Sequence, residues 1–236
     1  MRDITVRIGI AAACCTAVLL WIALPGGGDA VFVLPVALVP MLFLSRERSV
    51  RRRFFFGLLT GFLHFLLQLY WIVIVLGRYG GLPWFFSYPA LLLLSLYMAL
   101  YVAVFVLLAG NIYGRWGGAR ALWVLPLLWV GLDWLRAILF SGFPWMDLGY
   151  ALWQTPLLLQ TADLFGHYFI TFVVVLCNTL VFFLLSTKGK GKILSVVMVS
   201  LFFLAVVFYG HYRKTQLESL MFLEDSAVVG IVQGNI

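Results

Sequence analysis

Long apolar runs with almost no charged residues constrain the fold of this sequence more than any other feature. They cover residues 8–24, 31–44, 54–76, 88–112, 121–140, 164–185 and 193–209. A helix needs roughly 20 apolar residues to cross the hydrocarbon core of a bilayer. Lipid offers no hydrogen-bond partner to an exposed backbone, so such runs must be helical there. The sequence therefore predicts an all-α polytopic membrane protein with seven transmembrane helices.

The composition excludes the main soluble alternatives. Hydrophobic residues make up 64% of the 236 positions and charged residues only 11%, which leaves too little polar surface for a soluble domain of this size. The net charge of +7 could indicate nucleic-acid binding, but the basic residues lie between the apolar runs and form no stripe with exposed stacking residues. We expect no nucleic-acid partner.

The basic residues also predict the orientation, because cytoplasmic loops carry an excess of Lys and Arg. With a cytoplasmic N-terminus and seven crossings, only Arg78, Arg213 and Lys214 fall on the outer side. The second run is short and contains Pro35 and Pro40, so we expect it to be tilted, kinked or extended by its flanks. The charges favour keeping it as a span. The basic residues that this topology places in the cytoplasm are Arg2, Arg7, Arg46, Arg48, Arg51, Arg52, Arg53, Arg115, Arg120, Lys188, Lys190 and Lys192.

Two outer loops, residues 77–87 and 141–162, are rich in aromatic residues, Gly and Pro. Gly and Pro make defined turns, and Trp and Tyr favour the level of the lipid headgroups. We expect the longer loop, which has no Lys or Arg, to be an ordered element at the membrane surface, although an ordinary aromatic belt would explain single Trp residues equally well. The candidate lipid-side residues are Tyr79, Pro83, Phe143, Pro144, Trp145 and Tyr150.

Four of the polar residues inside the apolar runs are candidates for a specific role, because such groups are costly there unless they are paired. Asp133 and Arg136 share a helical face at a spacing of three residues. A structural ion pair is the favoured interpretation, and a proton or ion relay is the alternative. His64 and Gln68 are four residues apart and either bond to neighbouring helices or line a cavity. A transporter or channel would use all four residues.

The remaining reactive side chains suggest no site. His167 and His211 lie near span ends, where a lone histidine usually has no special role. Cys14, Cys15 and Cys177 lie in apolar runs with neither metal-site nor disulfide spacing, so we expect them to be small buried packing residues. We expect no metal and no cofactor.

The C-terminal part changes character after the last apolar run. Residues 1–210 form the predicted transmembrane domain, and residues 211–226 form a polar connector. Residues 227–236 are rich in β-branched residues and end in turn formers, which is typical of a strand. One strand cannot bury itself, so we expect it to begin an α/β domain of which this sequence holds only the start.

Several short segments follow one another in a recognisable order. They are YWI at 70–72, YGGLP at 79–83, LYMALY at 96–101, LDWLR at 132–136, GFPW at 142–145, GY at 149–150, QTADLFG at 160–166 and VGIVQGN at 229–235. Together they resemble the membrane half of the bacterial apolipoprotein N-acyltransferase family, although Asp133 stands where the family more often has Glu.

The resemblance implies a helical bundle in the inner membrane, carrying a nitrilase-like α/β/β/α domain on the periplasmic face. It implies an enzyme that takes an acyl chain from a phospholipid onto a cysteine. The acyl chain then passes to the amine of the diacylglyceryl-cysteine that begins an apolipoprotein.

In the family, a Glu, a Lys and the Cys act together beyond the position of Ile236, so we assign no catalytic residue here and expect these 236 residues to be inactive alone. The alternatives are the transporter or channel, for which no repeated span pattern is apparent, and a non-catalytic scaffold for a separate nitrilase-like chain.

Overall fold

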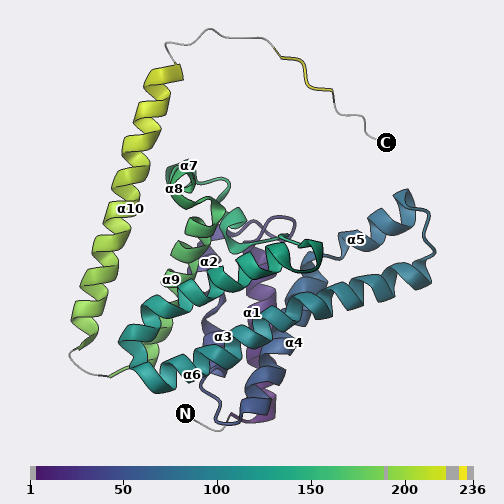
Figure 1. The fold of residues 1–236 in the computed structure, drawn as a ribbon, viewed down its shortest axis with the longest axis horizontal. Coiled ribbons are helices and arrows are strands. Elements are labelled where there is room, and N and C mark those ends of the chain that lie inside the picture. The colour runs from purple at the N-terminus through teal and green to yellow at the C-terminus, as the bar shows by residue number, and fades with distance from the viewer. Residues whose placement is uncertain (1–3, 189–190, 222–228, 233–236) are drawn as a thin grey trace.

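The computed structural model describes residues 4–188, 191–221 and 229–232, and all the regular elements in these residues are helical. Figure 1 shows most of the helices gathered into a bundle, with the last long helix running along one side. The all-α prediction is thus confirmed for the described residues. The long helices are α1 (Val6–Ala23), α4 (Val50–Gln68), α6 (Trp84–Ile138), α9 (His167–Ser186) and α10 (Gly191–Met221).

Helix length and composition support a membrane protein but give a lower span count than predicted. Within the described residues, four helices are long and apolar enough to cross a bilayer, namely α1, α6, α9 and residues 192–221 of α10. A fifth candidate combines α4 with α5 (Trp71–Ile74) and the π-helical turn η2 (Val75–Tyr79), which are bent by 47° from α4. These four or five candidates do not confirm the predicted count of seven.

The 55-residue helix α6 folds back on itself. Its backbone breaks at Gly117, where φ is +76°, a conformation that favours glycine. The ring centroids of Phe105 and Trp129 lie 4.8 Å apart, and those of Tyr97 and Phe140 lie 6.0 Å apart. These pairs are centred on Gly117, so the two arms of α6 are antiparallel. The arms correspond to the apolar runs predicted at residues 88–112 and 121–140.

The short apolar run at residues 31–44 is a broken helix. It consists of η1 (Val31–Val33), α2 (Leu34–Ala37) and α3 (Val39–Leu44), and each of the two α-helical pieces has a proline in its first turn. Asn178 of α9 supports the break: its Oδ1 accepts a bond from the Leu38 amide, and its Nδ2 donates to the Leu34 carbonyl, both at 2.8 Å. The predicted kink is therefore present, and a buried amide satisfies the backbone groups that the break exposes.

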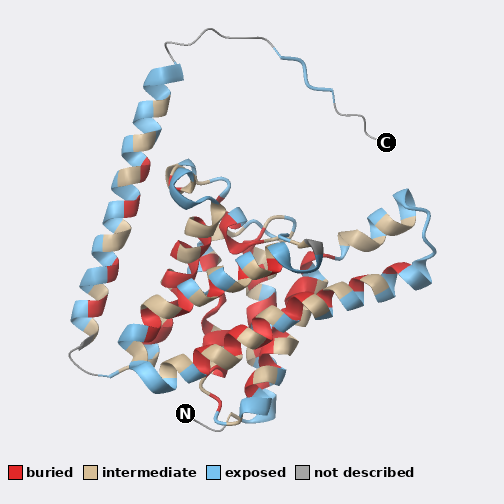
Figure 2. Cartoon of the chain, viewed as in Figure 1, coloured by how far each residue is buried: buried red, intermediate tan, exposed pale blue. Residues whose placement is uncertain are grey.

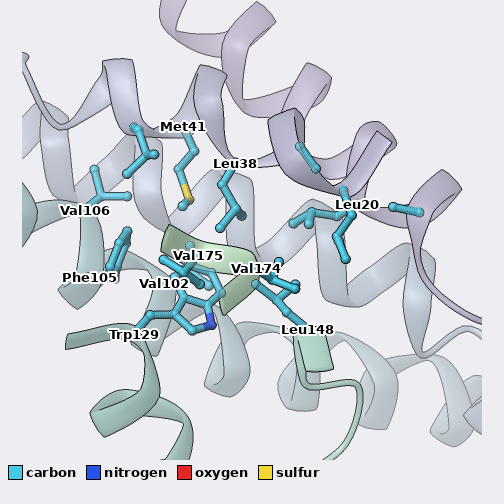
Figure 3. Packing of buried hydrophobic residues seen from close by; sticks show 14 of the residues in the cluster. Leu20, Leu38, Met41, Val102, Phe105, Val106, Trp129, Leu148, Val174 and Val175 are labelled. Atoms are coloured by element: carbon cyan, nitrogen blue, oxygen red, sulfur yellow. The ribbon is translucent and has the colours of Figure 1, made fainter. Parts of the chain in front are cut away.

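The centre of the bundle is a close contact between α4 and the first arm of α6. A Cβ atom added at Gly57 would lie 2.8 Å from the Cα of Ala103, and one added at Gly61 would lie 2.8 Å from the Cα of Ala99. Small residues thus allow the two backbones to approach. Buried residues concentrate in this region (Figure 2). Figure 3 shows Val102 and Phe105 of the first arm beside Trp129 of the second arm of α6 and beside Val175 of α9.

Helix α10 runs along one side of the bundle and contacts it in both halves. In its N-terminal half, Val199 packs with Leu122 of α6 and Leu176 of α9. Its C-terminal half is bonded to Asp163. The Tyr209 hydroxyl donates to Asp163 Oδ1 at 2.6 Å, and Arg213 Nε lies 2.8 Å from Asp163 Oδ2. Asp163 belongs to α8 (Ala162–Phe165), which follows α7 (Pro156–Leu159). The helix continues to Met221, so the first part of the predicted connector is helical.

The predicted strand at residues 227–236 lies largely outside the described residues. Residues 229–232 are described and have no regular secondary structure. The strand is therefore not confirmed, and the domain boundaries stay predictions.

Candidate functional site

Arg136 is the centre of a buried ion cluster at one end of the bundle. Its Nη2 lies 3.1 Å from Oδ1 of Asp133, one turn earlier on α6, and also contacts Oδ1 of Asp147. Arg136 is 2% exposed and Asp147 1%, so both charges are shielded from solvent. Two carboxylates therefore share one guanidinium. The planar fork of five N–H donors suits Arg to this arrangement.

The cluster extends from Asp147 to the start of α9. Nε2 of His167 lies 2.7 Å from Oδ2 of Asp147, while Nη1 of Arg136 donates to the Trp145 carbonyl at 3.3 Å. The amide of Gly149, two residues after Asp147, donates to Thr171 Oγ1 at 3.0 Å. The loop that follows α6 is therefore tied to both α6 and α9 by buried polar contacts.

Aromatic rings cover the cluster. The Tyr150 ring stacks on His167 with centroids 5.1 Å apart, and the rings of Trp71 and Trp145 lie 5.6 Å apart. Burial raises the pKa of Tyr150, and the nearby Asp147 carboxylate adds to this effect while Arg136 opposes it. The Tyr150 phenol therefore stays neutral, and able to donate a hydrogen bond, at physiological pH.

A small cavity lies beside the cluster, within the bundle. Its volume is about 30 Å³, and its wall includes His64 of α4, Trp129 of α6 and Met146 of the loop, together with Asp133, Arg136 and Asp147. The guanidinium carbon of Arg136 lies 5.5 Å from the centroid of the Phe65 ring, which also forms part of the wall. Such a contact stabilises a cation by attraction to the face of the ring.

His64 and Gln68 share a face of α4, but the structure gives them different surroundings. His64 is buried on the cavity wall. Gln68 is also buried, and its Nε2 donates to the Pro25 carbonyl at 2.6 Å, which links the end of α4 to the loop after α1. The geometry places one of the pair beside a cavity and uses the other as a link between segments.

The candidate lipid-side residues fall into two groups. Tyr79 and Pro83 lie exposed at the turn between η2 and α6, at the tip of a hairpin that projects from the bundle (Figure 1). Trp145 and Tyr150 lie beside the ion cluster and are partly exposed. Pro144 is exposed and Phe143 half-buried in the same loop.

Sequence reasoning missed Asp147 and His167. His167 was expected to have no special role, yet it contacts Asp147, whose side chain is wholly buried. One signal was available: Asp147 is the only charged residue between positions 141 and 162. An isolated acid in an apolar aromatic loop needs a partner.

The cysteines lie apart from the cluster. Cys14 and Cys15 are exposed on α1, and Cys177 is half-buried in α9. The expectation of buried packing is wrong for the first two, because they lie on the side of α1 that faces away from the bundle. Among the described residues, no three His, Cys, Asp or Glu side chains are grouped to hold a metal ion.

Comparison with known proteins identifies the family. Residues 16–180 match the family model described as the apolipoprotein N-acyltransferase N-terminal domain. An apolipoprotein N-acyltransferase from Geobacter metallireducens is 36% identical over 208 residues, which are 85% of this chain and 38% of the relative. The protein of the same name from Coxiella burnetii is 29% identical over 87% of this chain and 41% of its own length.

The chain thus spans about two fifths of the length of these curated relatives. The matched region contains the bundle from the second half of α1 to most of α9, including the whole ion cluster. The chain belongs to the apolipoprotein N-acyltransferase family, and the part that matches is the family's N-terminal domain.

Proposed function

We propose that this chain forms the membrane part of an N-acyltransferase of lipoprotein maturation in the bacterial inner membrane. The acyl donor is a membrane phospholipid, and the acceptor is the N-terminal diacylglyceryl-cysteine of an apolipoprotein. The observation that supports this proposal is the family match over residues 16–180, together with 36% identity over 85% of the chain to a protein of that name.

In this proposal the acyl transfer proceeds through a cysteine thioester in a nitrilase-like domain. A thiol needs a neighbouring base, and the developing oxyanion needs a positive group nearby. Asp133, Arg136 and Asp147 do not offer such a set, because the guanidinium is already shared by two carboxylates. These 236 residues alone are therefore inactive, and the role of the bundle is to present the lipid.

The loops at residues 77–87 and 141–162 form the lipid-side wall of the site in this proposal. Exposed aromatic residues support it: Trp84 is 72% exposed, Phe86 56% and Trp153 55%. Amphipathic and aromatic rings of this kind favour the boundary between headgroups and acyl chains. The ion cluster fixes the position of the second loop, so that the aromatic rings of this loop are held at a defined position above the bundle.

A segment exchange tests the proposal. In the Geobacter metallireducens relative, the matched segment would be replaced by the corresponding residues of this chain. The hybrid would be produced in cells depleted of their own N-acyltransferase. Mass spectrometry would then measure the mass of the N-terminal peptide of a reporter lipoprotein. We expect a peptide with three acyl chains, as with the unaltered relative.

Membrane abundance is the control for this exchange. A hybrid that reaches the abundance of the unaltered relative yet leaves the reporter with two acyl chains would contradict the proposal.

A further inference from the structure

We propose that the cavity beside Arg136 is an internal water site, in which about two water molecules complete the hydrogen bonding of the ion cluster. The site lies between α4, the two arms of α6 and the loop at Met146 and Asp147.

The wall carries several polar atoms that other side chains leave unsatisfied. His64 Nδ1, Trp129 Nε1, Asp133 Oδ2 and Arg136 Nε are buried and make no hydrogen bond of normal geometry among the described residues, although Trp129 and Asp133 are near enough to interact with each other. Each belongs to a residue that is at most 9% exposed, and all four residues line the same cavity. Buried polar groups nearly always have a hydrogen-bond partner, supplied by protein or by ordered water.

The size of the cavity matches water. Its volume is about 30 Å³. One buried water needs at least about 10–15 Å³ and two to four polar partners, so there is room for about two.

The mixture of donors and acceptors also favours water over an ion. Trp129 Nε1 and Arg136 Nε can only donate, while Asp133 Oδ2 in a carboxylate can only accept. An anion in the cavity would be repelled by the Asp133 carboxylate, and a cation would be repelled by the Arg136 guanidinium. Water donates and accepts, and His64 Nδ1 can serve either role according to its tautomer. A water pair would thus satisfy the wall without adding charge.

These waters would support the ionised form of the cluster inside the bundle. Arg136 uses both terminal nitrogens on Asp133, Asp147 and the Trp145 carbonyl, which leaves its Nε for water. Asp133 likewise bonds Arg136 through one oxygen and would bond water through the other. Ions inside a membrane protein are tolerated where they pair and line hydrated cavities.

X-ray radiolytic footprinting of the full chain in lipid nanodiscs tests the site, because hydroxyl radicals form from bound water and modify adjacent side chains. Phe105 and Phe182 make a matched pair: both are 1% exposed, but only Phe105 is on the cavity wall. We expect Phe105 to be modified several-fold faster than Phe182, and Met41 of the wall to be modified despite its full burial. Equal protection of Phe105, Met41 and Phe182 would overturn the proposal.

A variant pair then tests the location. His64→Phe replaces a polar wall group by a larger apolar ring, and we expect it to slow Phe105 modification toward the rate of Phe182. His211→Phe makes the same change at an exposed position and should have no effect. If Phe105 stays fast in a folded His64→Phe variant, the water lies elsewhere and the assignment is wrong. If that variant does not fold, the comparison of Phe105 with Phe182 in the native chain still tests the proposal.

Discussion

At the scale of single residues, the stability of the bundle depends on one guanidinium that forms ion pairs with two carboxylates. Asp133 and Asp147 both bond to Arg136, and the side chains of all three are at most 10% exposed. Removing one partner of a buried ion pair is far more costly than replacing the whole pair, because a charge is left uncompensated. Arg136 is therefore the member whose loss matters most.

We predict that Arg136→Met lowers the free energy of unfolding by about 3–5 kcal/mol, since two buried carboxylates lose their counter-charge. Denaturant unfolding of the full chain in detergent, followed by Trp fluorescence, would measure the loss. Arg78→Met is the matched control, because Arg78 is exposed, and we expect it to change little. Adding Asp147→Asn to Arg136→Met should restore part of the loss. Equal effects of the two single Arg variants would contradict the role of the cluster.

The sequence predicted half of this cluster. The spacing of Asp133 and Arg136 is a local property of one helix, and it placed the two side chains on one face. Asp147 and His167 join them through the path of a loop and the packing of α9. No helical or strand period relates residues 133, 147 and 167, so pattern alone could not bring them together.

At the scale of helices, the contact between α4 and α6 depends on small residues that face each other. Gly57 and Gly61 of α4 lie against Ala103 and Ala99 of α6. Lipid tails are as apolar as the helix surfaces, so close packing, and not the hydrophobic effect, holds such helices together. The length of each helix was predictable from its apolar run, whereas the facing small residues became evident only in the packed bundle.

We predict that Gly61→Ala destabilises the bundle by about 1–3 kcal/mol, the usual cost of overpacking. The added Cβ would lie 2.8 Å from the Cα of Ala99, and a backbone atom cannot move aside cheaply. Gly131→Ala is the control: apart from the helix's own backbone and the two chain neighbours, no atom lies within 4 Å of its added Cβ, so the better helix propensity of Ala should stabilise the protein slightly. Thermal unfolding in detergent would compare them, and a Gly61→Ala variant as stable as Gly131→Ala would refute the close contact.

At the scale of the whole molecule, the proposed seven crossings can be placed on the observed helices. In that prediction, helix α6 would supply two, as arms on either side of Gly117, and the broken segment at residues 31–44 would supply one. The others are α1, α4 with α5, α9 and α10. With a cytoplasmic N-terminus, the ion cluster and the loop at residues 142–152 then lie toward the periplasm, where the proposed acyl transfer takes place.

Reporter fusions test this topology. We predict that a reporter enzyme active only in the periplasm is active when fused after Tyr212 and silent when fused after Lys188. These positions lie on the two sides of the seventh crossing, so the pair also tests whether α10 spans the membrane. A reporter fused after Arg48 tests the short second span, and we expect this fusion to be silent as well. Activity after Lys188 or Arg48 would overturn the seven-span arrangement.

The sequence by itself determined that this protein lies in a lipid bilayer, that it is helical and to which family it belongs. Each follows from local information: about 20 apolar residues form a spanning helix whatever their neighbours are. The tertiary structure alone decided which polar groups meet, where α6 turns back, and that a buried amide of α9 supports the broken helix at Leu38. Those outcomes depend on contacts between residues far apart in the chain, and a buried charge or unpaired amide selects its partner by position in space and not by spacing in sequence.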